Sequence, residues 1–488
     1  MKLKVKDLDL STGGPLVAVL NDEDARKLGL YASDRIVIKK GKREISVLVN
    51  IAENHGKVRT GCIGIFEEVM KELKLKNNNL VSIYVDNKPE SLQYVKMKLD
   101  GKELNKEEME RIVSDVVGNK LSEVEIGFFV SGCYKYDLTI NEVNHLTRAI
   151  VGNSKTIKFK GKVVDKHSTG GIPGNRTTMI VIPIVAAAGL TIPKTSSRAI
   201  TSPSGTADVM EVLAPVNLAR GEIINVVKKT NGCMVWGGAL DLASADDKII
   251  KIERTLSLDP EGMLLSSIMA KKKAVGADYV LIDIPVGKEA KIKTKKDAKR
   301  LKKKFIKLGK KLNIKVKVMI SNGEQPVGNG IGPALEARDV MGVLAGDGPL
   351  DLKEKGIKMA GIILSMAGIS NGEKKAKEIL ESGMALEKMH EIIKAQGGKI
   401  KHIDAGKFIH SVKSSKSGKV SHISNNDINR LARILGCPKD KKAGIYLNYK
   451  LGNKVKKGQE LFSVYAESKA KLEYGVEFLR KNKVVNVN

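Results

Sequence analysis

Short stretches of alternating hydrophobic and polar residues fill the beginning of the chain. Segments 35–39, 45–49 and 80–85 alternate in this way, and a two-residue period is typical of a half-buried β-strand. A helical pattern at 67–75 interrupts these strands. Residues 1–85 are therefore predicted to form an N-terminal β-barrel.

The hydrophobic period then lengthens to that of an α-helix. Asn105 is suited to cap a helix that begins at Lys106. Hydrophobic residues recur at helical spacing as far as position 151. We predict a helical domain over 86–152, completed by helices within about 244–275.

Strand-like and helix-like segments alternate through the middle of the chain. A predicted strand at 162–164 precedes a glycine-rich loop and an apolar helix at 178–188, and another strand follows at 277–283. Such alternation is typical of an α/β domain with a mostly parallel sheet. We place this domain at 153–409 and expect a multidomain α/β fold class overall.

The last part of the chain, 410–488, returns to short strands and is predicted to be an α+β domain. Its turn at 451–459 resembles the hammerhead of biotinyl and lipoyl carriers. Because no lysine occupies the carrier motif, we expect no swinging arm.

The composition narrows the class of protein. The chain has 488 residues, of which 42% are hydrophobic, and this fraction excludes a mostly disordered chain. The longest apolar run, 179–190, is too short for a membrane helix. The four cysteines lie far apart, which argues against a disulfide framework or a zinc site. We therefore expect a cytoplasmic protein with no membrane partner.

The formal net charge of +30 has two explanations. The positive charge could serve to bind nucleic acid or small anions. Alternatively, it reflects a lysine-rich surface of the kind found in thermophilic proteins. The lysines are spread along the chain and only 4% of the residues are aromatic, which disfavours base stacking. We expect no specific nucleic-acid partner.

The strongest chemical signal is a polar, glycine-rich segment at 166–175. It follows a predicted strand and opens a predicted helix, where unpaired N–H groups and the helix dipole favour an anion. Gly170 and Gly171 allow the backbone to approach a phosphate closely, and Lys166 adds a positive charge. The residue order differs from that of a Walker loop. The alternative is an ordinary turn with an exposed lysine.

A second polar segment, 195–208, carries one arginine and seven hydroxyls. Loops after successive parallel strands lie at the same edge of a sheet, so we expect the two segments to meet. A helix cap would explain one of these residues but not all of them. Two anion-binding loops in one crevice indicate phosphoryl transfer, phosphoribosyl transfer or phosphorolysis, and composition does not choose among these.

Segment 166–171 is similar to the phosphate loop of the thymidine and pyrimidine-nucleoside phosphorylases. The resemblance extends from about 85 to 488 and includes 267–272. The N-terminal barrel, loosely similar to double-psi barrels, and segments 172–176 and 197–204 resemble the archaeal branch of that family, the AMP phosphorylases.

This resemblance implies a pentosyltransferase of nucleotide degradation. In such an enzyme AMP and phosphate give adenine and ribose 1,5-bisphosphate, and CMP and UMP are expected to react in the same way. Inorganic phosphate is a co-substrate, and neither a cofactor nor a metal is expected. Because related enzymes are dimers through the helical domain, the resemblance also implies a homodimer or a larger homo-oligomer.

The resemblance also assigns residues. Ser267 and Lys271 match positions that face the base, and His167 matches a histidine beside it. The arginine that holds the pyrimidine in the nucleoside enzymes falls on Ile252 here, which favours a site tolerant of a purine. The residues that match phosphate-binding positions are Lys166, Ser168, Gly170, Gly171, Thr178, Ser196 and Thr206.

A second departure from the nucleoside enzymes concerns the substrate's 5′-phosphate. Those enzymes have a glycine- and histidine-containing segment where this chain has several hydroxyls and an arginine, donors that suit an additional phosphate. Lys291 would lie at the same sheet edge, unless it is one more surface lysine. The loop residues assigned to the nucleotide are Ser197, Arg198, Ala199, Ile200, Thr201 and Ser202.

The leaving base departs more easily once it is protonated, so a general acid is needed. Asp259 precedes Ser267 by eight residues and matches a position that looks like the proton donor in the related branch. Aspartate before proline is also a common helix start. We favour Asp259 as the acid and His167 as a residue that positions the base.

Three alternatives stay open. A pyrimidine-nucleoside phosphorylase would act on thymidine or uridine without needing a 5′-phosphate. A phosphoribosyltransferase of the anthranilate type would need magnesium and acidic ligands, for which Asp208 is the only obvious candidate in the two segments. A non-enzymatic nucleic-acid binder would rest on the positive charge alone.

Overall fold

The computed structural model describes residues 1–13, 16–53, 56–86, 88–199, 202–240, 244–255 and 258–488. The chain forms two compact units, Met1–Ser154 with Ala243–Ser267, and Lys155–Leu242 with Ile268–Asn488. The four domains predicted from the sequence are a finer division, and their boundaries stay a prediction. Within the described ranges, no helix is long and apolar enough to span a membrane.

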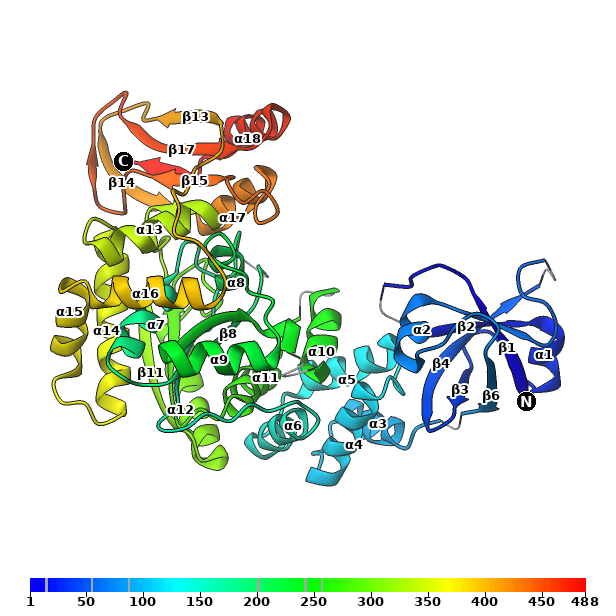
Figure 1. Ribbon diagram of the computed structural model, residues 1–488. Helices are drawn as coiled ribbons and strands as arrows, with labels where there is room; N and C mark the ends of the chain where they lie inside the picture. Colours follow the sequence, from blue (N-terminus) through cyan, green and yellow to red (C-terminus); the bar gives the residue numbers. More distant parts are fainter. Residues whose placement is uncertain (14–15, 54–55, 87, 200–201, 241–243, 256–257) are drawn as a thin grey trace. The chain divides into compact units, whose positions relative to one another are not determined.

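The first unit begins with a closed six-stranded barrel, which confirms the predicted barrel (Figure 1). Leu3 and Val5 of β1 point into its core while the lysines on either side are exposed, which is the two-residue period seen in the sequence. The barrel order is β1-β5-β2-β4-β3-β6. Its elements are β1 (Lys2–Asp7), β2 (Val17–Asn21), α1 (Asp22–Lys27), β3 (Arg35–Lys40), β4 (Arg43–Ala52), β5 (Cys62–Ile65), α2 (Glu67–Leu73) and β6 (Leu80–Val85).

Helices complete the first unit, and three of them begin at capping boxes. The side chains of Asn105, Ser122 and Thr139 each accept a backbone N–H three residues later, and the glutamate there returns the bond. The predicted cap at Asn105 is therefore confirmed. The helices are α3 (Ser91–Leu99), α4 (Lys106–Val117), α5 (Glu123–Tyr136), α6 (Ile140–Gly152), α10 (Ser244–Thr255) and the first half of α11 (Glu261–Ala274).

The second unit is built on parallel strands, as predicted. Strands β11, β10 and β7 pair in parallel in that order, and β8 pairs in parallel with β9. A bridge between Val163 and Thr191 joins the approaches to β7 and β8. The strands are β7 (Val164–Ser168), β8 (Ile192–Ser196), β9 (Gly232–Trp236), β10 (Tyr279–Val286) and β11 (Lys315–Asn322).

The core of this unit surrounds one helix that is apolar on all sides. Every residue from Thr177 to Ala186 of α7 is buried, which confirms the predicted buried helix. Helices α14, α15 and α16 pack against α7 (Figure 1). The helices are α7 (Thr177–Ala187), α8 (Thr206–Met210), α9 (Arg220–Thr230), the 3₁₀ helix Gly237–Leu240, α12 (Lys295–Leu312), α13 (Pro333–Ala345), α14 (Leu350–Met366), α15 (Gly372–Glu381) and α16 (Met384–Ala395).

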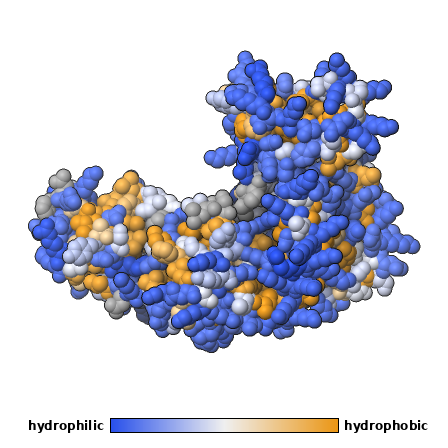
Figure 2. Space-filling view, turned by 180° about the vertical axis from the view of Figure 1, so that it is seen from behind, coloured by the Kyte–Doolittle hydropathy of each residue, from blue (hydrophilic) through white to orange (hydrophobic). Residues whose placement is uncertain are grey.

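The lysine-rich segment near position 300 forms a solvated helix rather than a separate patch. Leu301, Phe305 and Leu308 of α12 are buried along one stripe, because residues three and four positions apart share a face of a helix. On the face of the molecule shown in Figure 2, hydrophilic side chains cover most of the surface and hydrophobic patches lie between them.

Antiparallel strands form the end of the second unit. One sheet has the order β12-β15-β17-β13 and another the order β16-β14-β18. Because β12 precedes α13 and pairs with β15, the first of these sheets connects the α/β part to the C-terminal part. The elements are β12 (Gly330–Ile331), β13 (Phe408–Lys413), β14 (Gly418–Ile423), α17 (Asn425–Ile434), β15 (Gly444–Leu447), β16 (Lys454–Val455), β17 (Glu460–Ala466), α18 (Lys469–Lys481) and β18 (Val485–Val487).

Candidate functional site

The first polar segment begins inside a strand, not after one. The predicted strand at 162–164 is displaced, because β7 runs from Val164 to Ser168 and pairs with β10 over that whole length. Lys166 and Ser168 therefore share the rigid backbone of the sheet. This placement fixes two of the predicted phosphate ligands more firmly than a loop would.

The glycines after β7 turn the chain sharply toward α7. Gly170 and Gly171 have φ angles of 88° and 90°, in the left-handed region that favours glycine. A Cβ atom on Gly171 would lie 3.2 Å from the backbone nitrogen of Lys291. The tertiary structure thus brings Lys291 beside the first segment, as the sheet-edge argument predicted.

Lys166 is a buried cation at the centre of this segment. Its Nζ donates to the hydroxyls of Thr177 at 3.1 Å and Thr178 at 2.8 Å, both in the first turn of α7. Burial lowers the pKa of Lys166 to about 7, with Lys355 and Arg176 adding to the effect while Asp283 opposes it. A bound anion would stabilise the charged form of this side chain.

Three further hydroxyls at the ends of β7 and β8 are buried and lack a hydrogen-bond partner among the described residues. They belong to Thr169, Thr195 and Ser196. Because a buried polar group without a partner costs about 1–3 kcal/mol, such a group indicates a ligand or ordered water at that place. Ser196 was predicted to bind phosphate, whereas Thr169 and Thr195 were not assigned a role.

Arg176 connects the two polar segments, although no functional role was predicted for it from the sequence. Its guanidinium donates to the Thr206 hydroxyl at 3.1 Å and to the Ser204 carbonyl at 3.0 Å. It also forms an ion pair with buried Glu336, which accepts a hydrogen bond from Ser204. The second segment packs tightly here, because a Cβ on Gly205 would lie 2.3 Å from the Ser197 carbonyl oxygen. The predicted meeting of the two segments is therefore seen in the structure.

Replacing Arg176 with alanine is expected to lower the free energy of unfolding by about 3–5 kcal/mol, because the change leaves the buried Glu336 carboxyl without its partner. The midpoint of urea unfolding measures this loss. Arg300→Ala is the matched control, since the Arg300–Asp297 pair at 3.1 Å is exposed and such pairs contribute about 0–1 kcal/mol. Equal shifts in the two variants would contradict the structural role of Arg176.

Arg198, predicted to bind the nucleotide, is held by carboxylates in this structure. Its guanidinium lies 3.1 Å from Asp208 and 2.7 Å from Glu211, and it covers the ring of Trp236 at 5.1 Å. Hydrogen bonding to Glu211 raises the pKa of Arg198 further above its ordinary value, so the side chain stays charged. Lys441 pairs with Glu211 at 2.5 Å.

The other predicted nucleotide residues of this loop have separate positions. Ser197 is exposed, the Ala199 N–H donates to Asp208 at 2.7 Å, and Ser202 donates to the Ser204 carbonyl at 2.7 Å. Ile200 and Thr201 lie outside the described residues. The loop is thus tied to the start of α8.

His167 lies on β7 between Lys166 and Ser168 and is half-buried. Burial lowers the pKa of His167 well below its ordinary value, and the charges of Lys272 and Lys194 lower it further. The imidazole is therefore neutral near pH 7. A neutral imidazole is suited to hydrogen bonding with a base rather than to donating a proton as an acid.

Helix α11 carries the residues predicted to face the base. Ser267 and Lys271 are four residues apart and so lie on one face of this helix. Ser267 donates to the buried carboxylate of Asp246 at 2.9 Å. Asp259, before the start of α11, is exposed. The boundary between the two units falls inside α11, so that Asp259 and Ser267 belong to the first unit and Lys271 to the second.

Ile252 is the residue that the resemblance matches to an arginine of the nucleoside phosphorylases. It lies on α10, and a Cβ atom on Gly127 of α5 would be 3.7 Å from its side chain. An aliphatic side chain packed against a neighbouring helix offers no donor to a pyrimidine carbonyl. The isoleucine at this position therefore cannot make the hydrogen bond that an arginine would make to a pyrimidine.

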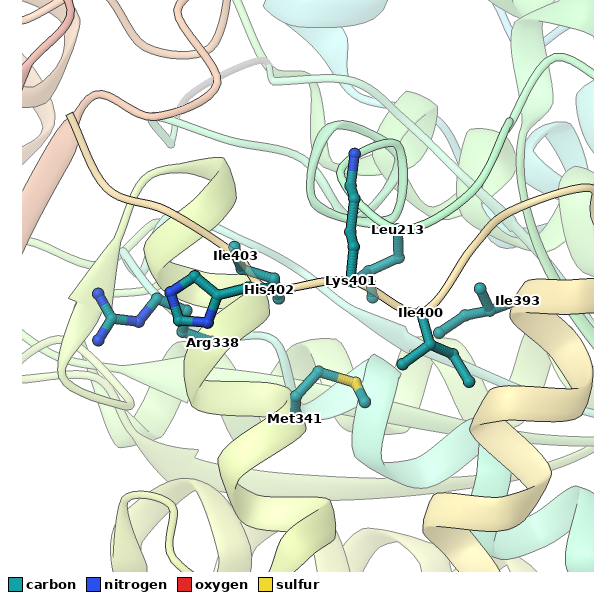
Figure 3. Close-up of a pocket in the computed structure, with 8 residues that line it drawn as sticks. All are labelled: Leu213, Arg338, Met341, Ile393, Ile400, Lys401, His402 and Ile403. Carbon is teal, nitrogen blue, oxygen red and sulfur yellow. The ribbon is translucent and has the colours of Figure 1, made fainter.

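A hollow in the second unit lies apart from these residues. It has a volume of about 260 Å³, and mostly apolar side chains line it together with Arg338, Lys401 and His402 (Figure 3). Segment 400–403, exposed except for half-buried Ile403, forms one wall. The candidate site is thus defined by converging polar groups rather than by this hollow.

Comparisons with known proteins agree with this arrangement. Three family models match: "Glycosyl transferase family, helical bundle domain" at 92–154, "Glycosyl transferase family, a/b domain" at 160–386, and "Pyrimidine nucleoside phosphorylase C-terminal domain" at 419–486. The chain is 44% identical to the AMP phosphorylase of Methanocaldococcus jannaschii over 98% of this chain and 96% of the relative. It is 45% identical to the AMP phosphorylase of Thermococcus kodakarensis over 100% of this chain and 98% of the relative.

A solved structure gives a more distant likeness. The anthranilate phosphoribosyltransferase of Thermus thermophilus matches with a TM-score of 0.52 and 17% identity, over 62% of this chain and 99% of that one. At that identity the likeness shows a shared fold and nothing about the reaction.

Proposed function

The chain belongs to the AMP phosphorylase family, and from this premise we propose how its residues act. The enzyme is a pentosyltransferase that transfers the pentose of AMP from the base to inorganic phosphate. Attack of phosphate at the anomeric carbon breaks the glycosidic bond, so the products are adenine and ribose 1,5-bisphosphate. The observation that carries the site assignment is the cluster of buried, unpaired hydroxyls at the edge that also holds Lys166.

Inorganic phosphate is assigned to the space between the two polar segments. Lys166 supplies the positive charge and Ser168, Thr178, Ser196 and Thr206 supply polar groups around it. Gly170 and Gly171 bring the backbone close to the anion. The bound phosphate then stabilises the positive charge that develops on the sugar before it attacks. No cofactor other than this co-substrate enters the proposal.

Protonation of the leaving base is assigned to Asp259, with His167 positioning the base. The neutral state of His167 argues against that residue as the acid, because a neutral imidazole near pH 7 has no proton of suitable acidity to give. Asp259 is exposed in this structure, so its role as the acid requires that the bound substrate bury the carboxyl and raise its pKa. Ser267 and Lys271 are assigned to the base. The reaction then needs no covalent intermediate on the protein.

The 5′-phosphate of the nucleotide is assigned to the loop of Arg198 and to Lys291. Arg198 stays charged, and its carboxylate partners hold the guanidinium in a fixed place beside Trp236. The backbone of Lys291 approaches Gly171, which places a second lysine beside the first segment. These residues would make the enzyme bind a nucleotide more tightly than the nucleoside that lacks the 5′-phosphate.

Replacing Arg198 with alanine is expected to reduce the preference for AMP over adenosine by about 10- to 100-fold, because a hydrogen bond to a charged group contributes about 1.5–3 kcal/mol. The ratio of kcat/KM for the two substrates measures the preference. Lys441→Met is the control, since Lys441 pairs with the same Glu211 but lies outside the loop. An unchanged ratio in Arg198→Ala would show that the 5′-phosphate binds elsewhere.

CMP and UMP are proposed as further substrates. Because Ile252 replaces the arginine that would select a pyrimidine, we expect the base site to discriminate less between purine and pyrimidine rings. The alternative of a thymidine or uridine phosphorylase has less support, because the full-length relatives above are AMP phosphorylases.

The remaining proposals concern assembly and location. We expect a homodimer or a larger homo-oligomer in the cytoplasm, with small molecules rather than nucleic acid or membrane as partners. Val124 and Phe128, one turn apart on α5, are 69% and 51% exposed and offer an apolar surface to a second copy. Size-exclusion chromatography with light scattering measures the assembly.

The reaction is tested by incubating the enzyme with AMP, adenosine, CMP, UMP or thymidine, each with and without phosphate. Chromatography follows the free base, and a parallel set contains a metal chelator. Release that needs phosphate, favours nucleotides and survives the chelator is expected. Release from thymidine or uridine in preference to AMP would contradict the substrate assignment.

A further inference from the structure

Three groups from neighbouring elements converge on Asp283, a fully buried carboxylate in the middle of β10. Ser321 of β11 donates to Oδ1 at 2.6 Å, Ser168 of β7 donates to Oδ2 at 3.1 Å, and the Nζ of Lys355 lies 3.0 Å from Oδ2. A backbone hydrogen bond also holds Ser168 beside Asp283, because the N–H of the next residue, Thr169, donates to the Asp283 carbonyl at 2.9 Å. The Ser168 hydroxyl is therefore held in one orientation.

The protonation state of Asp283 decides what Ser168 offers to a ligand. Burial opposes ionisation, but Lys355 and Lys166 outweigh it and hold the pKa of Asp283 below its ordinary value. An ionised carboxylate only accepts hydrogen bonds, so the single proton of the Ser168 hydroxyl is directed to Asp283. The serine oxygen then presents lone pairs, which repel a bare oxyanion and accept a hydrogen bond from an acidic hydroxyl.

We propose that Ser168, with its own proton directed to Asp283, accepts a hydrogen bond from the one P–OH group of hydrogen phosphate, so that the site selects this dianion over dianions of similar shape that carry no proton. This inference rests on the proposed function, because it needs phosphate to bind at this edge of the sheet. Asp283 acts through Ser168 and is a positioning residue. Lys166 and the unpaired hydroxyls of Thr169 and Thr195 remain as donors for the proton-free oxygens.

Monofluorophosphate is the probe, because it is a dianion with fluorine in place of the hydroxyl group of hydrogen phosphate. Calorimetric titration of the unliganded enzyme near pH 8 compares the two anions, since both are dianions at that pH. We expect phosphate to bind at least about tenfold more tightly than monofluorophosphate, the difference that 1.4 kcal/mol produces. Equal affinities in the unsubstituted enzyme would overturn the proposal.

Ser168→Ala separates an accepting serine from a donating one. Loss of an acceptor is expected to weaken phosphate binding about tenfold while the affinity for monofluorophosphate stays within twofold. If Ser168 instead donated to the anion, the substitution would weaken the binding of both anions by the same factor, and that result would overturn the proposal. The substitution removes one oxygen from a strand end, so the fold is retained.

Asp283→Ala tests the positioning residue. Without the carboxylate, Ser168 has no acceptor on that side, and Lys355, which only donates, cannot replace it. The serine proton then turns to the anion, and the preference for phosphate is expected to fall below about threefold. Ser321→Ala is the control, because it leaves the Ser168–Asp283 bond in place and is expected to retain the preference. A preference unchanged in Asp283→Ala would overturn the inference.

The same preparations are assayed for phosphate-dependent release of adenine. Release of adenine together with equal anion affinities would overturn this inference and leave the proposed function standing. A clear preference for hydrogen phosphate without release of adenine would support the anion site and contradict the proposed function.

Discussion

Replacing Lys166 with methionine is expected to raise the KM for phosphate by about 100-fold or more, with a much smaller effect on binding of the nucleotide. Lys166 is the buried cation between β7 and the first turn of α7, and its hydrogen bonds go to neutral hydroxyls of Thr177 and Thr178. A charge-assisted hydrogen bond contributes about 1.5–3 kcal/mol, and burial strengthens the attraction to a dianion. Steady-state kinetics at varied phosphate and saturating AMP measures the effect.

Lys162→Met is the matched control for this prediction. Lys162 precedes the same strand, is exposed, and donates to the Ala367 carbonyl at 2.8 Å. It is expected to leave the KM for phosphate unchanged. A similar increase in both variants would mean that general loss of positive charge, rather than a phosphate ligand, explains the effect.

The same lysine predicts a pH dependence. Because burial lowers the pKa of Lys166 to about 7, the free enzyme loses this positive charge as the pH rises above 7. The kcat/KM for phosphate, expressed per hydrogen phosphate dianion, is therefore expected to fall about tenfold per pH unit in that range. Lys166→Met should lack this decline, and its persistence in the variant would assign the titration to another group.

Replacing Asp259 with asparagine is expected to lower kcat by about 10²–10⁴-fold, the range typical of a lost general acid. Asparagine caps a helix about as well as aspartate, so a role of Asp259 limited to starting α11 would leave kcat nearly unchanged. The substitution thus separates catalysis from helix capping. Single-turnover release of adenine from AMP is the measurement, and an unchanged thermal unfolding temperature shows that the fold is intact.

The leaving group provides a second test of Asp259. In an AMP analogue methylated at N7, the base already carries a positive charge and leaves without further protonation. With this substrate the deficit of Asp259→Asn is expected to shrink to less than about tenfold, because the missing proton is no longer needed. An equal deficit with both substrates would contradict the assignment of Asp259 as proton donor, and His167→Asn would then be examined in the same way.

Local pattern was sufficient to predict most elements of this protein. The alternation of Leu3 and Val5 with lysines, the cap at Asn105 and the apolar stripe of α12 each depend on residues within a few positions of one another. Such features follow from the periods of strands and helices and from the unpaired N–H groups of a helix start. The two polar segments were found in the same way, because glycines, hydroxyls and cations gather within ten to fourteen residues of sequence.

Long-range pairing determined what surrounds those segments. Asp283 orients Ser168 from 115 positions away, and Lys272 pairs with Asp165 from 107 positions away. Arg176 and Glu336 form their ion pair through the meeting of two helix starts, α7 and α13. No local period encodes these partners, because they are brought together only when parallel strands and the helices between them pack. The sequence by itself therefore identified the family and the two polar segments to which phosphate is assigned, whereas the tertiary structure decided which buried charges hold these segments in place and which of their hydroxyls have no hydrogen-bond partner among the described residues.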